Sequence, residues 1–194
     1  MFGAPIRTRP PRRKLRKRDF AWILAPGAAL MLLLGIGHAA GYRVNETSSA
    51  PVGLWRVAPI VELHPGMRVT LCLPPDVPII RIAIERRYLA SGECAGGYAP
   101  LLKEILAGPG DVVDFAPGAT AVNGAAPHEI AVLDTDSRGR NLPHTPFGRY
   151  TLGADQYWLF SDLNPRSLDS RYFGPVTRDR LIAAATPVLT FDPR

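Results

Sequence analysis

An uncharged apolar segment near the start of the chain stands out from the pattern that follows it. From Phe20 to Tyr42 the sequence contains no Asp, Glu, Lys or Arg. A helix of about 20 such residues, rising about 1.5 Å per residue, can cross the roughly 30 Å hydrocarbon core of a bilayer. Trp22 and Tyr42 lie near its two ends, where amphipathic rings favour the membrane interface. The pattern predicts one transmembrane helix over residues 20–42.

Beyond this segment, residues 43–194 show short apolar or alternating stretches separated by turn residues, which is typical of β-strands. Asn123-Gly124 is a strong hairpin-turn signal between such stretches. Ile79 to Leu89 has the spacing of one helix, and the polar residues of 135–148 predict an exposed loop. We therefore expect one mainly β, mostly antiparallel domain. The clearest strand segments are 68–73, 111–115, 157–160 and 184–191.

The positive charge of the chain is concentrated in its first 19 residues. These hold eight of the 23 Lys and Arg residues and one of the 17 acidic residues, so the net charge of +6 describes this tail. Aromatic side chains that stack on bases do not alternate with the cations, so nucleic acid is not an expected partner. By the positive-inside rule, a basic tail before an apolar segment predicts a cytoplasmic N-terminus and, in a bacterium, a periplasmic domain.

Two alternatives to a retained membrane anchor stay open. A cleaved secretory signal would end at the poor site Gly37-His38-Ala39, although the apolar segment exceeds the ~7–15 residues usual for such signals. Arg12-Arg13 also allows a twin-arginine export signal. We expect a basic cytoplasmic tail at residues 1–19, a transmembrane anchor at 20–42 and a periplasmic domain at 43–194.

The chain contains only two cysteines, Cys72 and Cys94, and both lie on the predicted periplasmic side. This number excludes a disulfide-rich scaffold and a four-cysteine zinc site. In an oxidising compartment a disulfide between them is favoured over two buried free thiols. It would close a loop of about 22 residues and stabilise the fold by about 3 kcal/mol in the chain-entropy model.

A single lysine occurs beyond the tail. Residues 20–194 contain Lys103 and 14 arginines. Arg is not deprotonated in proteins, whereas a buried Lys can lose its proton and act as a base. In the alternating stretch Pro100 to Leu106, apolar neighbours would desolvate the amine and lower its pKa. On composition alone, an exposed Lys103 paired with Glu104 is the stronger interpretation.

Three sequence segments change that balance. The first reads NETSSAPVGLW at residues 45–55, the second LKEILAGPGDVV at 102–113, and the third SDLNPRSLDSRYFGPV at 161–176. In order, spacing and content they resemble the type I signal peptidase superfamily, and within it the conjugative-transfer, TraF-type peptidases. The cysteine pair, with C-x-G-G leading into P-L-L-K, is similar to the same branch. The resemblance implies an antiparallel, signal-peptidase-like catalytic domain.

The resemblance also implies a Ser–Lys dyad, in which a serine attacks the scissile carbonyl and an unprotonated lysine takes its proton. It assigns Ser49 as the nucleophile, two residues before Pro51, although the spacing of the larger signal peptidases would select Ser48. Lys103 becomes the general base. Thr47 would place its hydroxyl in the oxyanion hole, unless it is only a turn residue.

The supporting residues implied by the resemblance come from the third segment. Ser167 would orient the Lys103 amine. Asp169 and Arg171 would form an ion pair that braces the loop near the site, and the alternative is a surface pair that contributes little. Gly108 to Asp111 predicts a structural turn. The histidines have no acid partner at motif spacing and are treated as ordinary polar residues, so we expect neither a metal nor a cofactor; they are His64, His128 and His144.

The function implied by the resemblance is a membrane-anchored endopeptidase that processes an exported precursor after a small residue. A conjugative pilin is the expected substrate, and cyclisation of the product is a further outcome. The expected partners are the membrane-bound precursor and the lipid bilayer. A general signal peptidase and a non-catalytic β scaffold of an envelope secretion complex stay open. Two departures weaken the general signal peptidase: Glu104 stands where the family commonly has Arg, and S-D-L-N-P-R replaces G-D-N-R-D-N.

Overall fold

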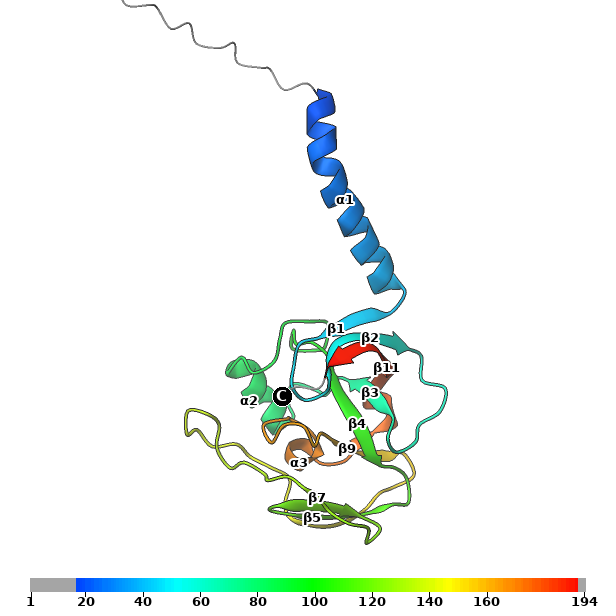
Figure 1. Cartoon of the computed structure of the whole chain (residues 1–194). Coiled ribbons are helices and arrows are strands. Elements are labelled where there is room, and N and C mark those ends of the chain that lie inside the picture. Colours follow the sequence, from blue (N-terminus) through cyan, green and yellow to red (C-terminus); the bar gives the residue numbers. More distant parts are fainter. Residues whose placement is uncertain (1–16, 192–194) are drawn as a thin grey trace, which may run out of the picture. The chain divides into compact units, whose positions relative to one another are not determined.

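The computed structural model describes residues 17–191, with side chains from Leu24 onward (Figure 1). The chain divides into two compact units, Met1–Ala40 and Gly41–Arg194. Most of the predicted basic tail lies outside the described residues.

The first unit contains the helix α1 (Lys17–Ala39), which includes Pro26. The large apolar side chains described in this helix are exposed, among them Leu30 and Leu34. Within the described range, no helix has both the length and the apolar character that a membrane crossing requires. The transmembrane helix at residues 20–42 stays a prediction.

The described part of the second unit contains eleven strands in two sheets. The strands are β1 (Tyr42–Asn45), β2 (Val52–Ala58), β3 (Arg68–Leu71), β4 (Leu101–Ala107), β5 (Val112–Ala116), β6 (Ala119–Val122), β7 (His128–Glu129), β8 (Gly148–Thr151), β9 (Gln156–Phe160), β10 (Val176–Thr177) and β11 (Leu181–Phe191). The larger sheet has the order β1-β2-β11-β3-β4-β9-β10, and the smaller sheet β7-β6-β5-β8. Every strand pair is antiparallel, so the predicted mainly β, antiparallel class is confirmed.

The predicted strand segments and turns all appear in the fold. The segments 68–73, 111–115, 157–160 and 184–191 fall on β3, β5, β9 and β11. Asn123 and Gly124 have φ of 52° and 71°, the positive values of a hairpin turn that suits the twist of paired strands. The Gly108–Asp111 turn links β4 to β5, with the Asp111 N–H donating to the Gly108 carbonyl at 3.1 Å.

The helical segments of the second unit are short. They are α2 (Pro78–Glu85), α3 (Ser170–Phe173) and the 3-10 turn η1 (Arg178–Arg180). The helix predicted over Ile79 to Leu89 ends earlier, because Arg87 adopts a left-handed φ of 57°. The Tyr88 N–H then donates to the Ala83 carbonyl at 2.8 Å and closes the helix with a Schellman-type cap.

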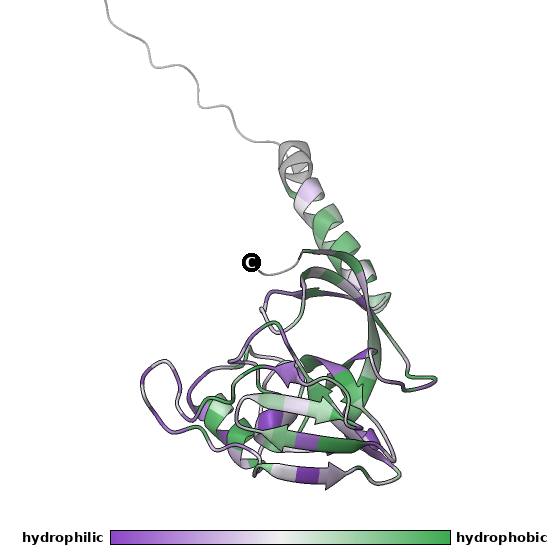
Figure 2. Cartoon of the chain, turned by 60° about the horizontal axis from the view of Figure 1, so that its bottom comes forward, coloured by the Kyte–Doolittle hydropathy of each residue, from purple (hydrophilic) through white to green (hydrophobic). Residues whose placement is uncertain are grey.

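The main core lies between the larger sheet and α2. Val69 of β3 and Ile105 of β4 pack in one cluster with Ile80 of α2. Along β4 every second residue is buried, as expected for side chains that alternate across a sheet. Figure 2 shows hydrophobic and hydrophilic residues alternating along several strands. This alternation places Lys103 on the inward face of β4.

A disulfide joins Cys72, directly after β3, to Cys94, with the two Cα atoms 5.5 Å apart. That spacing is usual for a disulfide. The predicted bridge is confirmed, and the alternative of two free thiols is wrong. The bond ties the segment after α2 to the larger sheet.

Residues 135–148 form a loop up to the start of β8, as predicted, but the loop is not exposed throughout. Asp136, Leu142 and Thr145 are buried. Leu142 belongs to the main core. The prediction of an exposed loop is therefore wrong for these residues. Asp136 and Thr145 are buried with hydrogen-bond partners, and Leu142 packs against apolar side chains of the core.

Candidate active site

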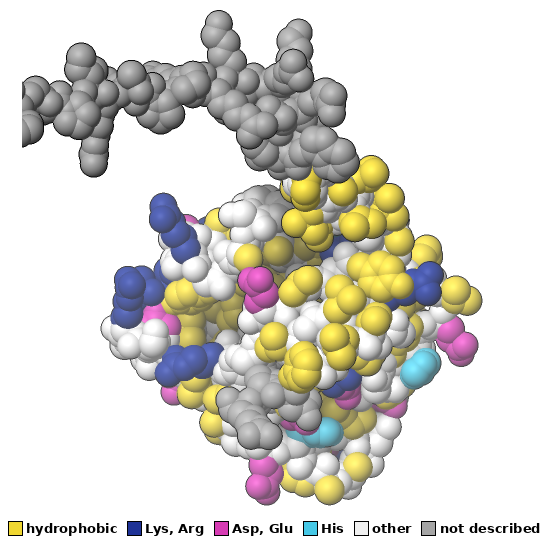
Figure 3. Space-filling model, turned by 45° about the horizontal axis from the view of Figure 1, so that its top comes forward, with side chains coloured by type: hydrophobic (Ala, Val, Ile, Leu, Met, Phe, Trp, Pro, Cys, Tyr) yellow, Lys and Arg dark blue, Asp and Glu magenta, His cyan; other side chains and the backbone are white. Residues whose placement is uncertain are grey.

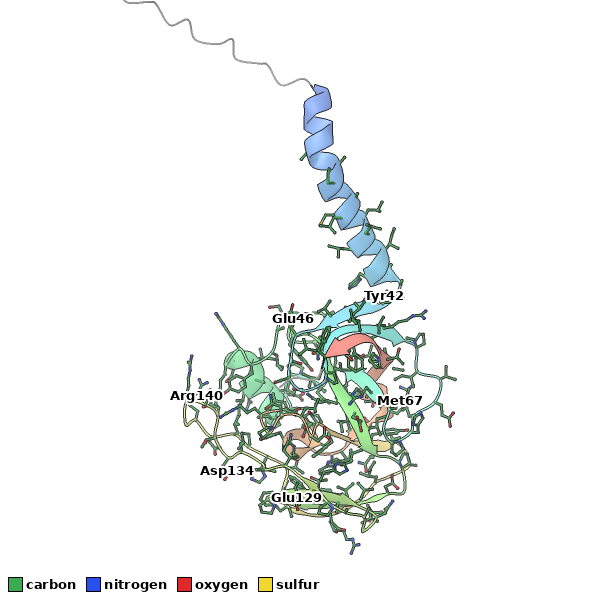
Figure 4. The ribbon with its side chains drawn as sticks, viewed as in Figure 1. Tyr42, Glu46, Met67, Glu129, Asp134 and Arg140 are labelled. Carbon is green, nitrogen blue, oxygen red and sulfur yellow. A yellow bond between two sulfur atoms is a disulfide. The ribbon has the colours of Figure 1, made fainter. Side chains whose placement is uncertain are left out.

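A cleft of about 620 Å³ opens in the second unit and is bordered by two walls. The serine wall comprises residues 44–49 and 101–103, together with Asn164, Arg166 and Leu168. The loop wall comprises residues 88–90 and 99–100, together with Asp136, Ser137 and Leu142. Figure 3 shows a hollow bordered largely by hydrophobic side chains, with Lys and Arg side chains grouped beside it. Figure 4 labels Glu46 of the serine wall, and Arg140, which pairs with Asp136 of the loop wall.

Lys103 is a buried amine on the serine wall, with 4% of its surface exposed. Its Nζ donates to the Ser167 Oγ at 2.9 Å. Burial lowers the pKa of Lys103 from 10.5 to about 8; the Asp169 carboxylate opposes this shift, and the Arg171 guanidinium adds to it. A larger fraction of this amine is therefore unprotonated at neutral pH than of an exposed lysine.

The alternative of an exposed Lys103 paired with Glu104 is wrong. Glu104 follows Lys103 on β4 and so lies on the opposite face of the strand. Its carboxylate pairs with Arg68 of the neighbouring strand at 3.0 Å. The alternation of the strand separates the two side chains.

The serine loop, residues 45–51, is organised by Asn45. The Asn45 Nδ2 donates to the carbonyls of Thr47, Ala50 and Pro51 at 2.9, 3.0 and 3.1 Å. The Asn45 Oδ1 accepts from the Thr47 hydroxyl at 2.7 Å. One asparagine thus holds the turn between β1 and β2, and it also holds the hydroxyl predicted for the oxyanion hole.

Ser48 and Ser49 both line the cleft but differ in how they are held. The Ser48 Oγ accepts from the Asn164 Nδ2 at 2.6 Å. Ser49 is instead held through its backbone, because its carbonyl accepts from the Ser161 Oγ at 2.6 Å. Among the described residues, no hydrogen bond engages the Ser49 hydroxyl, and none joins it to Lys103.

Asp169 and Arg171 form a fully buried ion pair behind the serine wall. Two parallel hydrogen bonds of 2.8 Å join the guanidinium to the carboxylate, and both side chains are 0% exposed. The alternative of a surface pair is therefore wrong. The D-S-R sequence forms this geometry locally, because Asp169 caps α3 by accepting from the Arg171 N–H at 3.2 Å.

Arg171 also binds the loop that precedes it. Its guanidinium donates to the carbonyls of Ser161, Asn164 and Ser167 at 3.3 to 3.5 Å, and to that of Ala131 at 3.1 Å. The side chain faces the ring of Phe160, at 5.1 Å from the ring centre. Each of the three guanidinium nitrogens thus has at least one hydrogen-bond acceptor, as a buried charge requires.

The loop wall is held by a cluster around Asp136 that the sequence did not indicate. The carboxylate accepts from Arg86 at 3.2 Å, from Arg140 at 2.7 Å and from the Tyr88 hydroxyl. Burial acts to raise the pKa of Asp136. The hydrogen bonds from Tyr88 and from the backbone and side chain of this loop outweigh burial and hold that pKa below its usual range. The D-x-R-G-R spacing signals a local turn, but nothing in it points to Arg86.

The histidines lie outside the cleft. His144 does have an acid partner, contrary to expectation, with its Nε2 3.5 Å from the Asp134 Oδ1. That carboxylate is 82% exposed. Among the described residues, no group of three His, Cys, Asp or Glu side chains could hold a metal ion.

The structure thus gathers the predicted residues on one wall. Thr47, Ser49 and Lys103 line the cleft, and Ser167 contacts the lysine. The sequence interpretation missed Ser161 and Asn164. Both lie in the part of the third segment that departs from the family pattern. That departure was the one feature of the sequence that could have drawn attention to them.

Comparison with known proteins gives a family and several relatives. Residues 17–190 match the family described as signal peptidase, peptidase S26. The plasmid transfer protein TraF of Escherichia coli is 40% identical over 171 residues, 88% of this chain and 95% of that protein. The conjugal transfer protein TraF of Agrobacterium fabrum is 39% identical over 180 residues, 92% of this chain and 97% of that protein. The crystal structure of a signal peptidase I from Enterococcus faecalis matches with a TM-score of 0.36 and 18% identity, over 64% of this chain and 97% of that one.

Proposed function

The chain belongs to the signal peptidase family, peptidase S26, and from that premise we propose that it is a serine endopeptidase with Ser49 as nucleophile and Lys103 as general base. The environment of Lys103 carries the proposal. Its buried amine, with a pKa lowered to about 8, lines the same cleft as Ser49. An amine with such a pKa can accept a proton near neutral pH, which an ordinary lysine does poorly.

In the proposed acylation, the Ser49 Oγ forms a bond to the scissile carbonyl carbon while its proton passes to the Lys103 Nζ. The tetrahedral intermediate then collapses, the C–N bond breaks, and Lys103 gives the proton to the leaving amine. A water molecule that loses its proton to the same amine finally releases the acyl group from Ser49. Hydrogen bonds between catalytic groups are often absent in free enzymes and form in the substrate complex.

Ser167 and Thr47 have supporting roles in this proposal. Ser167 holds the lysine amine through the 2.9 Å hydrogen bond. Thr47 and the Ser49 N–H would donate to the developing oxyanion. Because the Thr47 hydroxyl donates to Asn45 in the free protein, this role requires the hydroxyl to turn toward the substrate.

We propose that the substrate is an exported precursor of conjugative transfer, a pilin precursor in the first instance, cut after a small residue. The relatives described as plasmid and conjugal transfer proteins support this choice. Cyclisation would follow if the amino terminus of the substrate, rather than water, attacked the acyl-enzyme. The cyclic product would then be lighter by one water molecule than the cleaved one.

The proposal includes an anchor formed by α1, with the N-terminus in the cytoplasm and the second unit in the periplasm. Three observations support it: the uncharged stretch from Phe20 to Tyr42, the eight basic residues before it, and the exposed apolar side chains of α1. The disulfide between Cys72 and Cys94 is consistent with an oxidising compartment. The proposed partners are the membrane-bound precursor and the lipid bilayer.

The test uses the full chain in detergent micelles with a purified pilin precursor, and mass spectrometry identifies the products. We expect cleavage after a small residue, and loss of cleavage in both Ser49→Ala and Lys103→Met. Thr151→Ala, which removes an exposed hydroxyl on β8 outside the cleft, serves as the control and should retain the wild-type rate.

Four outcomes would redirect the proposal. Wild-type cleavage by Ser49→Ala would contradict the assignment of the nucleophile, and the same result for a variant that also lacks Ser48 would contradict serine catalysis. Rescue of cells depleted of their housekeeping signal peptidase would favour a general signal peptidase. An unchanged transfer phenotype with Ser49→Ala and Lys103→Met would favour a non-catalytic scaffold.

A further inference from the structure

One short loop contacts both halves of the proposed dyad. The bracket loop, residues 161–167, turns three of its backbone carbonyls inward to the Arg171 guanidinium. Three of its side chains make contacts on the serine wall. Ser161 donates to the Ser49 carbonyl, Asn164 donates to the Ser48 hydroxyl, and Ser167 accepts from Lys103.

We propose that Ser161 is a positioning residue for the nucleophile. Its hydroxyl holds the carbonyl of Ser49 and so sets the direction in which the Ser49 side chain leaves the backbone. This inference rests on the proposed function, since it acts through Ser49, and it adds a residue to which the family resemblance gives no role.

The hydrogen bond from Ser161 limits the movement of the planar peptide group between Ser49 and Ala50. Because the peptide group is planar, a fixed Ser49 carbonyl also fixes the plane that continues to Ala50. Ala50 is 2% exposed and packs with Trp55 and Ala185, so the far end of that plane is held by apolar contacts. With the plane held at both ends, rotation about the Cα–C bond of Ser49 is restricted.

The contact is well suited to such a role. Ser161 is 5% exposed, and the distance of 2.6 Å is short for a hydrogen bond between a hydroxyl and a carbonyl oxygen. Among the described residues, no hydrogen bond engages the Ser49 hydroxyl, so its direction depends on the backbone. A reacting atom misplaced by about 1 Å can lower the rate about 100-fold.

The bracket loop also links the nucleophile to the base. Ser167, six residues after Ser161, holds the Lys103 amine, and Arg171 binds the carbonyls of both serines. The two reacting groups come from strands and turns far apart in the sequence, and this loop gives them a common support. A side chain is needed for the contact, and the family pattern G-D-N-R-D-N has glycine where this chain has Ser161.

The experiment measures kcat and KM for the full chain in detergent micelles. The substrate is a synthetic precursor peptide with alanine at the first and third positions before the cut. We expect Ser161→Ala to lower kcat by about 10- to 100-fold, with KM changed by less than about twofold. Ser161→Thr, which keeps the hydroxyl, should restore most of kcat. The midpoint of the pH–rate profile should stay near 8 in both variants, because the base is not altered.

The matched control is Thr145→Val. The Thr145 hydroxyl is also buried and donates to a backbone carbonyl, that of Ser170, at 2.8 Å, but it does not line the cleft. A general loss of stability would affect both variants equally, whereas positioning predicts a loss of kcat in Ser161→Ala alone. Equal kcat values for Ser161→Ala and Thr145→Val would overturn the inference.

The proposed function and this inference can be tested independently of each other. If the wild type cuts the peptide and Ser49→Ala does not, the function stands whatever Ser161→Ala does. If the wild type does not cut the peptide, the rate at which a fluorophosphonate modifies Ser49, with loss of fluoride, replaces kcat as the readout. A slower modification of Ser49 in Ser161→Ala supports positioning, an equal rate overturns it, and no modification of Ser49 in the wild type overturns both.

Discussion

The two walls of the cleft use the same pair of residue types in opposite ways. Behind the serine wall, Asp169 and Arg171 are 0% exposed and bind each other through two hydrogen bonds. On the loop wall, Asp136 is bound by Arg140, whose side chain is 38% exposed, and by Arg86. Breaking a fully buried ion pair is costly because the remaining charge has no partner. The Asp136 side chain is only 6% exposed, but those of Arg86 and Arg140 are 21% and 38% exposed, so water can screen these pairs and solvate the arginines. We infer that the serine wall is rigid and that the loop wall can adapt to a bound chain.

The largest expected effect comes from breaking the buried pair. Asp169→Ala leaves the Arg171 charge uncompensated in the interior, so we expect the free energy of unfolding to fall by about 3–5 kcal/mol. Urea titration of the full chain in micelles, followed by near-ultraviolet circular dichroism, measures the loss. Asp136→Ala is the matched variant on the loop wall and should lose much less. Equal losses would remove the distinction between the walls.

The loop wall is held covalently as well. The disulfide closes a sequence separation of 22 residues next to the segments 88–90 and 99–100 that border the cleft. Replacing both Cys72 and Cys94 by Ala should lower the free energy of unfolding by about 3 kcal/mol in the chain-entropy model. The same titration under non-reducing conditions measures it, and treatment of the wild type with dithiothreitol should give a similar loss. A loss below about 1 kcal/mol would show that packing alone holds this wall.

The difference between the walls also explains what the sequence could predict. The family resemblance implied the pair of Asp169 and Arg171; the two residues are two positions apart, and the capping geometry of a helix start joins them. The alternation around Lys103 allowed a buried amine, but composition alone favoured an exposed one, and the family resemblance reversed that interpretation. Interactions of this kind depend on local chain geometry, which short patterns encode.

The missed interactions join segments that only the completed fold brings together. Ser161 and Ser49 are 112 residues apart, and Arg86 and Asp136 are 50 apart. No spacing rule links such residues, because the closure of the sheets sets their distance. The early end of α2 was missed for a different reason: Arg is not a residue that the left-handed conformation at position 87 favours.

Replacing Lys103 on the serine wall should raise stability and not lower it, because a buried amine destabilises the fold when it is protonated. The folded state holds the pKa of Lys103 at about 8, below the ordinary 10.5. Below pH 8 both states are protonated and the folded state carries the full penalty. Between pH 8 and 10.5 the unfolded state binds more protons, so wild-type stability rises with pH through this window.

Lys103→Met removes this penalty. After subtraction of the lost hydrogen bond to Ser167, we expect a gain of about 2 kcal/mol in the free energy of unfolding at pH 7. The gain should shrink as the pH rises from 8 toward 10.5. Urea titrations at a series of pH values give this profile, and Glu104→Gln on the exposed face of the same strand is the control without such a change. A gain that does not vary with pH would contradict a depressed lysine pKa.

The smallest expected effect concerns the loop wall. Asp136→Asn keeps the shape of the side chain but removes the charge that binds Arg86 and Arg140. If this wall contacts the substrate chain and not the reacting atoms, kcat should stay constant, and KM should rise by less than about fivefold, since partly exposed ion pairs contribute little. The precursor peptide used for Ser161→Ala provides the assay. We expect Ser161→Ala to lower kcat at nearly constant KM, and Asp136→Asn to raise KM at constant kcat. A fall in kcat with Asp136→Asn would mean that the loop wall also sets the geometry of the dyad. The contrast between a rigid wall and an adaptable wall would then have to be abandoned.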